Sequence, residues 1–142
     1  MQLLRICQEP DFLLQPLPRL SDEWCCVLDA LRMTASQCRV AAQTDLFEAC
    51  AVLSIKENAS RDGFSQVLLK CLRGVISTKP IFYQPGTNTL SFDEAWLMQA
   101  LIASRGGDIH SLAFLIRSRV PKMYQRNIVF LINGISDKFT KN

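Results

Sequence analysis

The chain has 142 residues and a formal net charge of +3, and 49% of its residues are hydrophobic. These values predict a single domain, residues 1–142, whose core needs no metal ion or disulfide. No apolar run approaches the roughly 20 residues of a membrane-spanning helix. Arg5 interrupts the short apolar run at the N-terminus, so we expect neither a membrane span nor a signal peptide.

Six cysteines stand at positions 7, 25, 26, 38, 50 and 71, and no two of them form a CxxC pair. Those at 25, 38, 50 and 71 fall in apolar helical patterns, where a thiol behaves as a small hydrophobic group. The vicinal pair Cys25 and Cys26 is a redox candidate, but adjacent residues of a helix point in different directions. The single histidine, His110, is far from every cysteine, so we expect no metal and no other cofactor. Reduced cysteines favour a cytoplasmic location.

Residues 1–20 hold three prolines and are expected to form an extended N-terminal arm. Ser21, Asp22 and Glu23 are typical of a helix start and predict a helix to about residue 33. The small residues 34–36 are expected to break or kink it. A second helix is expected over about 37–56, followed by a loop over 57–63. One side of the second helix carries Val40, Phe47, Cys50, Ala51 and Ser54.

The third predicted helix, over about 64–76, has the cleanest helical spacing in the chain. Its apolar positions follow i, i+3, i+4 and i+7, which predicts one face laid on the core. These positions are Phe64, Val67, Leu68, Cys71, Leu72, Val75 and Ile76. The opposite face carries Gln66, Lys70, Arg73 and Ser77.

Residues 79–90 do not fit a helix. The run Ile81-Phe82-Tyr83 favours a strand, and Gln84-Pro85-Gly86-Thr87 suits a type II turn with glycine third. Thr89 and Leu90 then return as a second short strand. We therefore predict a short β-hairpin or extended segment near 80–90 that packs on the helices, because a hairpin alone is only marginally stable.

Three helices follow with clear boundaries, over about 92–105, 109–119 and 122–138. Ser91 and Glu94 form a capping box, Gly106-Gly107 is a stop, Asp108 is an N-cap and Pro121 suits a first turn. The helix 92–105 is apolar on almost every side, which is typical of a central helix or of one that docks a partner. The expected inward residues of the last two helices are Ile109, Leu112, Ala113, Ile116, Val120, Ile128, Leu131, Ile132, Ile135 and Phe139.

Together these elements predict a mainly α fold, an irregular bundle of about six helices. Charge is distributed unevenly along it: residues 1–57 carry five basic and eight acidic residues, and residues 105–142 carry seven and two. This polarity can orient a charged partner. A basic cluster near 117–126, with Tyr124 among its cations, resembles a nucleic-acid surface, but cations also suit a helix C-terminus.

Two groups of residues invite a catalytic interpretation, and both have a simpler structural one. Asp93 and Glu94 are paired carboxylates, yet they occupy the first turn of a helix, where negative charge is stabilising. Asp108 lies two residues before His110, but it is better explained as an N-cap. With no catalytic motif in the chain, we expect that the protein is not an enzyme.

The function expected from the sequence is that of a small non-enzymatic protein-interaction module, an adaptor, regulator or chaperone-like protein. Its partner is expected to be another protein, with a second copy of the chain, giving a homodimer, among the candidates. Aromatic residues anchor such interfaces and arginines steer acidic partners, although Trp96 fits a core position as well as an interface. The interaction residues predicted are Phe82, Tyr83, Trp96, Arg117, Arg119 and Arg126. The alternative is a nucleic-acid-binding regulator that uses the basic C-terminal helices.

Overall fold

The computed structural model describes residues 20–38, 45–55, 60–76 and 78–139. Within these ranges the chain forms six helices and no strand, which confirms the mainly α prediction. The helices are α2 (Asp22–Cys38), α3 (Leu46–Ile55), α4 (Arg61–Ile76), α5 (Phe92–Arg105), α6 (Ile109–Arg119) and α7 (Lys122–Phe139). The predicted N-terminal arm lies outside the described residues, except for Leu20.

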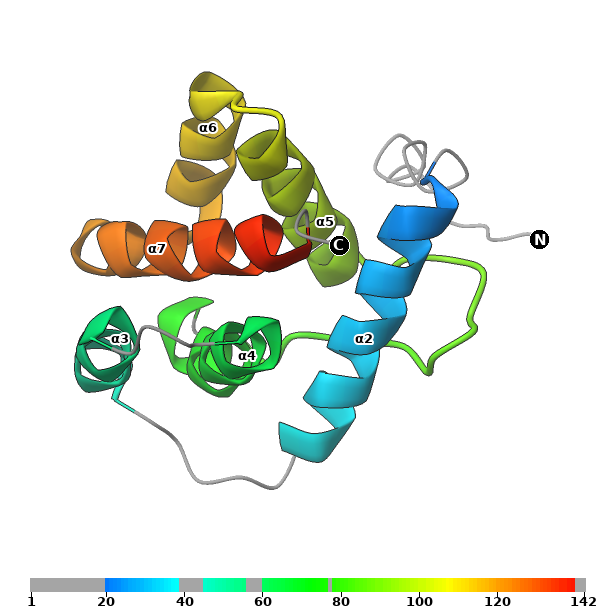
Figure 1. Cartoon of the computed structure of the whole chain (residues 1–142), viewed down its shortest axis with the longest axis horizontal. Coiled ribbons are helices and arrows are strands. Elements are labelled where there is room, and N and C mark those ends of the chain that lie inside the picture. The colour runs from blue at the N-terminus through cyan, green and yellow to red at the C-terminus, as the bar shows by residue number, and fades with distance from the viewer. Residues whose placement is uncertain (1–19, 39–44, 56–59, 77, 140–142) are drawn as a thin grey trace.

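Helix α7 lies in the middle of the bundle (Figure 1). Helices α5 and α6 pack along one side of it and α3 and α4 along the other, while α2 packs on α4. The central position of α7 follows from its sequence, which places four large aliphatic residues on one stripe. These predicted core residues, Ile128, Leu131, Ile132 and Ile135, are fully buried. The side chain of Phe139 is outside the described set.

Helix α5 is largely buried, which agrees with the first of the two alternatives that its apolar sequence left open. Its buried residues include Ala95, Trp96, Leu97, Met98, Ala100 and Leu101. The predicted capping box is present, because Glu94 N–H donates to Ser91 Oγ at 3.1 Å and Ser91 N–H donates to Glu94 Oε1 at 3.0 Å. At the other end Gly107 has φ 74°, and Asp108 N–H donates to the carbonyl of Ala103 at 2.9 Å, which closes the helix.

The predicted boundary between the first two helices is wrong. Helix α2 continues through residues 34–36, where Thr34 Oγ1 donates to the carbonyl of Ala30 at 3.0 Å within the helix. The next helix begins only at Leu46, because the Asp45 carboxylate accepts from Glu48 N–H at 2.9 Å and caps it. Small polar residues weaken a helix without ending it, whereas a capping carboxylate defines a start.

Several predicted inward positions are exposed, Ala51 and Ser54 of α3 among them. In α3 the buried residues are Leu46, Cys50 and Leu53, so Phe47 lies at the edge and stacks on Tyr124 with ring centroids 5.6 Å apart. In α6 Ile109 is 73% exposed; it lies in a run of exposed residues, 105–111, that no element among the described residues covers. The remaining α6 pattern holds, with Leu112 and Ile116 buried.

The four cysteines predicted for the core differ in burial. Cys50 and Cys71 are buried as predicted, Cys38 is half-buried, and Cys25 is exposed, contrary to the core interpretation. Burial raises the pKa of the Cys71 thiol to about 11, with a further contribution from the nearby Cys50. Burial also raises the pKa of Cys50. These two thiols therefore stay protonated and belong to the hydrophobic core.

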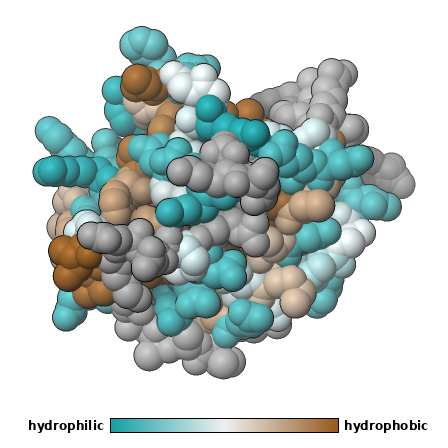
Figure 2. Space-filling view, viewed as in Figure 1, coloured by the Kyte–Doolittle hydropathy of each residue, from teal (hydrophilic) through white to brown (hydrophobic). Residues whose placement is uncertain are grey.

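The surface mixes hydrophilic and hydrophobic residues (Figure 2). The strongest hydrophobic colour on the face shown lies at the left edge, near α3, and at the top, near α6. The exposed apolar residues of these two helices include Val52, Ile55, Ile109 and Phe114. None of the helices in the described ranges has the length and apolar character that crossing a bilayer requires.

The contact between α4 and α7 depends on Gly134. A Cβ atom added there would lie 2.5 Å from Phe64 Cε1 and 2.8 Å from its Cγ. Phe64 is buried and packs edge-to-face on Phe130, so its ring has little room to move. We expect Gly134→Ala to lower the free energy of unfolding by about 1–3 kcal/mol, despite the better helix propensity of alanine, as measured by urea denaturation.

Gly63 provides the matched control in α4. A Cβ atom there meets its nearest neighbours at 3.7 and 3.8 Å, which is ordinary contact. Gly63→Ala should therefore be neutral or stabilising by up to about 1 kcal/mol. An increase in stability from Gly134→Ala that matches that of Gly63→Ala would contradict the close packing of α4 on α7.

Candidate interaction site

An ion pair between α2 and α5 lies at the centre of the site. Arg32 Nε donates to Glu94 Oε2 at 2.9 Å, and its Nη2 donates to Oε1 at 2.9 Å. The two side chains are only 1% and 0% exposed. Charge-assisted bidentate pairs are among the strongest hydrogen bonds in proteins, and burial makes each partner depend on the other.

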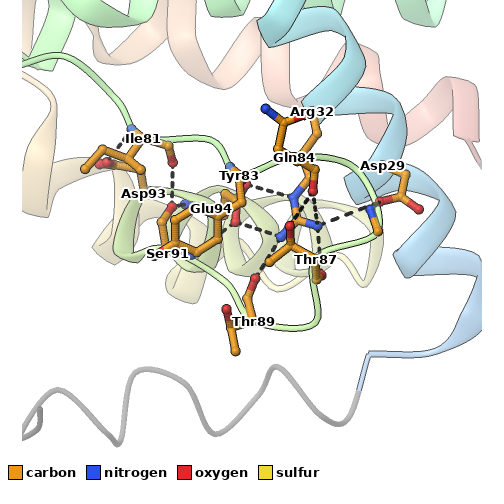
Figure 3. Close-up of polar contacts among 11 residues, drawn as sticks. Asp29, Arg32, Ile81, Tyr83, Gln84, Thr87, Thr89, Ser91, Asp93 and Glu94 are labelled. Carbon is orange, nitrogen blue, oxygen red and sulfur yellow. Dashed lines mark hydrogen bonds and ion pairs between the residues drawn. The ribbon is translucent and has the colours of Figure 1, made fainter. Parts of the chain in front are cut away.

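The same guanidinium also binds the backbone that connects α4 to α5 (Figure 3). Nη1 donates to the carbonyls of Gln84 and Thr87 at 3.4 and 3.0 Å, and Nη2 donates to that of Thr89 at 2.8 Å. Arg32 therefore makes five hydrogen bonds, as many as a guanidinium has N–H groups. This side chain fixes the path of residues 84–89 around α2.

The first half of the connection is held by side chains from the start of α5. Tyr83 N–H donates to Glu94 Oε2 at 2.7 Å, and Ile81 N–H donates to Asp93 Oδ2 at 2.9 Å. Ser91 Oγ donates to the carbonyl of Ile81 at 2.5 Å. The backbone groups that a second strand would bind are thus bound to a helix terminus.

This arrangement explains why the β-hairpin predicted near 80–90 does not form. Residues 81–83 are not helical, as expected, but their backbone groups bond to the side chains of Ser91, Asp93 and Glu94 and not to Thr89 and Leu90. The predicted turn itself is confirmed. Thr87 N–H donates to the carbonyl of Gln84 at 3.1 Å, and Gly86 has φ 89°, as the third position of a type II turn requires.

A groove of about 420 Å³ lies between α2, α4 and the connection. We call it the 79–85 groove. Its residues come from three parts of the chain. The five hydrogen bonds of Arg32 to Glu94 and to the backbone of residues 84–89, which we call the clamp, hold two of these parts, α2 and the connection, together. The lining residues are Arg32, Ala35, Ser36, Cys38, Leu69, Lys70, Arg73, Lys79, Pro80, Ile81, Phe82, Tyr83, Gln84 and Pro85.

The groove is positively charged. Besides Arg32, whose charge is matched by Glu94, its lining contains Lys70, Arg73 and Lys79. No lining residue is acidic, and within the described ranges these three cations make no ion pair. Their field is therefore uncompensated at the groove, where it attracts negatively charged groups.

Two of the predicted interaction residues line this groove. Tyr83 is 38% exposed, and Phe82 is half-buried and packs against the core. Trp96 lies elsewhere: it is 5% exposed, and its Nε1 donates to the carbonyl of Leu115 at 2.8 Å. Its indole joins α5 to α6 within the core, which is the alternative that the sequence left open for this residue.

The predicted basic cluster is divided in the structure. Arg119 Nη1 lies 2.8 Å from Asp93 Oδ1, and its guanidinium lies 4.9 Å from the ring centroid of Phe92 and 5.3 Å from that of Trp96. It therefore ties the end of α6 to the start of α5. Arg117 and Arg126 are exposed and do not line the groove.

The structural interpretation of Asp108 is confirmed. Its carboxylate accepts from Ser111 N–H at 3.1 Å and caps α6, and the hydrogen bonds with Ser111 lower the pKa of Asp108. His110 is exposed in the following turn. Of the other candidate pair, Glu94 completes the capping box of α5, accepts from Tyr83 N–H and pairs with Arg32. Asp93 accepts from Ile81 N–H and pairs with Arg119.

The cations of the groove were not among the residues predicted to interact. Lys70 and Arg73 were visible on the polar face of their helix, but nothing in the sequence sets them beside Lys79. Arg32 had a local signal, because it follows Leu28 by four residues and so interrupts the apolar stripe of α2. A charge on a buried stripe indicates a buried partner, yet Glu94 is 62 residues away.

Comparison of the chain with protein-family models, with curated proteins and with solved structures gives no match. In the described part of the chain, no three His, Cys, Asp or Glu side chains are arranged to hold a metal ion.

Proposed function

We propose that this protein is a small non-enzymatic interaction module that binds a segment of another protein in the 79–85 groove. The observation that carries the proposal is the meeting of Phe82 and Tyr83 with Lys70, Arg73 and Lys79 in one groove. Apolar area with convergent charged groups is the usual composition of a binding site. Tyrosine offers a large contact area and a hydroxyl, which suits an interface anchor.

The clamp beneath the groove supports a binding role. Binding costs less when the surface is already ordered, because fewer side chains and loops lose freedom. Here five hydrogen bonds from Arg32 and two to Ile81 and Tyr83 N–H order the connection before any partner arrives. The groove is thus a preformed surface.

The non-enzymatic part of the proposal rests on how the carboxylates near the groove are used. Glu94 is fully buried and accepts from Arg32, Tyr83 N–H and Ser91 N–H. Asp93 is bound to Ile81 N–H and Arg119. A general acid or base must reach a substrate proton, and these groups are held by structural contacts instead.

The test is affinity purification of the tagged full chain from its own cells, with wild type compared with Tyr83→Ala and Phe114→Ala. Phe114 is 67% exposed on α6 and outside the groove, so it is a matched aromatic control. We expect a stoichiometric protein partner that survives nuclease, is retained by Phe114→Ala and is reduced about tenfold by Tyr83→Ala. Equal thermal unfolding curves would show that both variants are folded.

Two results would contradict the proposal. The first is a partner that Tyr83→Ala retains in full. The second is co-purified nucleic acid whose removal by nuclease, or by Arg117→Glu with Arg126→Glu, releases all bound protein, which would favour the alternative predicted from the sequence. If the partner is a second copy of the chain, wild type should sediment as a dimer and Tyr83→Ala as a monomer.

A further inference from the structure

The three positive charges of the groove that are unpaired within the described ranges lie on two of its walls, α4 and the connection. Lys70 and Arg73 are three residues apart on α4, so they project from the same side of that helix. Lys79 comes from the connection that forms another wall. Arg73 and Lys79 are solvent-exposed and Lys70 is half-buried, so all three charges are accessible to a partner.

The groove also has apolar walls. Leu69 is buried, Phe82 is half-buried and packs on the core, and Ala35 lies on the α2 side. The volume of about 420 Å³ is within the range of sites that enclose a ligand group. An apolar side chain that enters this space loses contact with water, which is favourable.

A nucleic acid fits this arrangement less well than a peptide does. Phosphate contacts are spaced along a backbone and need a continuous basic track. The exposed cations Arg117 and Arg126 do not line the groove, and Arg119 is paired with Asp93, so these arginines do not extend the three charges of the groove. A compact set of cations beside an apolar surface suits carboxylates that flank an apolar side chain.

We infer that the partner segment is an acidic peptide, in which aspartate or glutamate residues flank an apolar residue that enters the 79–85 groove. Charge complementarity argues for this occupant, since no lining residue is acidic and three lining cations have no counter-charge among the described residues. The inference rests on the proposed function and adds the chemistry of the segment that is bound.

The test is selection of random dodecapeptides displayed on phage against the immobilised full chain. We expect the retained peptides to be enriched in Asp and Glu relative to the unselected library, around a Leu, Ile, Phe or Met position. The most frequent peptide is then synthesised with a fluorescent label. Its twin, with each Asp and Glu changed to Asn or Gln, should bind about tenfold more weakly.

Charge reversal locates the binding. Arg73→Glu and Lys79→Glu should each weaken binding of the labelled peptide about five- to tenfold. Arg73→Lys keeps the charge, so its affinity for the peptide should stay within about threefold of that of wild type. Arg126→Glu makes the same change outside the groove and should have less than about a twofold effect. Raising the salt concentration from about 50 to 500 mM should weaken peptide binding by wild type several-fold, and peptide binding by the Arg73→Glu variant less.

The outcomes separate this inference from the proposed function. Retained peptides that are not acidic, but whose binding Tyr83→Ala abolishes, would overturn the inference and leave the groove as the binding site. Acidic peptides that bind Arg73→Glu and Lys79→Glu as well as wild type would overturn it as well. Failure to retain any peptide, together with a cellular partner insensitive to Tyr83→Ala, would contradict both.

Discussion

Replacement of Glu94 by alanine is expected to lower the free energy of unfolding by about 3–5 kcal/mol, because it leaves a buried guanidinium without its counter-charge. The pair is almost completely hidden from solvent, and Glu94 also accepts from Tyr83 and Ser91 N–H. The variant therefore loses the clamp and half of the capping box at once. Chemical denaturation of the purified chain measures this loss.

An exposed ion pair provides the control. Arg105 and Glu23 lie 2.7 Å apart, but their side chains are 31% and 53% exposed. Solvent screens such pairs, so Glu23→Ala should cost less than about 1 kcal/mol. A cost for Glu94→Ala no larger than that for Glu23→Ala would contradict the structural role of the buried pair.

A double variant distinguishes the effect of the Arg32–Glu94 pair on the stability of the fold from its effect on the ordering of residues 81–89. Replacing both charges, Arg32→Met with Glu94→Leu, removes the unpaired charge and should recover much of the stability that Glu94→Ala loses. It should not recover the hydrogen bonds to Gln84, Thr87 and Thr89, so residues 81–89 should exchange their amide hydrogens faster than in wild type. Slow exchange there would show that other contacts hold the connection.

The second large effect is expected from Trp96→Ala, at about 3–5 kcal/mol of lost stability. The indole is 5% exposed, bonds the carbonyl of Leu115 and supports the Arg119 guanidinium. Its removal leaves a cavity between α5 and α6 and removes one of the hydrogen bonds to the Leu115 carbonyl. Thermal or urea denaturation measures the loss.

Phe92→Ala is the comparison for this change. Phe92 contacts the same guanidinium at 4.9 Å but is 50% exposed, so its truncation should cost about 1 kcal/mol or less. If Trp96→Ala were as stable as wild type and instead lost a bound partner, Trp96 would be an interface residue after all.

Local capping chemistry made the second half of the fold predictable. Ser91 with Glu94, Gly107 and Asp108 each satisfy backbone groups within a few residues, so the bounds of α5 and α6 follow from the sequence. In the first half one such signal was overlooked: Asp45 caps the start of α3, because its carboxylate accepts from Glu48 N–H.

The site was only partly predictable for a related reason. The run 81–83 has the composition of a strand, and its turn was predicted correctly from Pro85 and Gly86. Its actual partner, the side chains at the start of α5, was interpreted only as a helix cap. Arg32 interrupts the apolar stripe of α2, but its partner Glu94 is 62 residues away, so no local pattern identifies the pair.

The interaction residues divide along the same line. Phe82 and Tyr83 were predicted from composition, and both line the groove. Lys70, Arg73 and Lys79 become neighbours only through folding. Arg119 is a cation in the sequence, but the structure pairs it with Asp93, and no local feature distinguishes it from Arg117.

Under the proposed function, the 79–85 groove is the surface on which a partner binds. Hydrogen exchange of the full chain, alone and saturated with the partner that wild type retains, tests it most directly. The structure predicts added protection in residues 69–73 and 79–85, with residues 109–126 unchanged. Protection confined to residues 109–126 would contradict the claim and place the binding surface on the basic C-terminal helices.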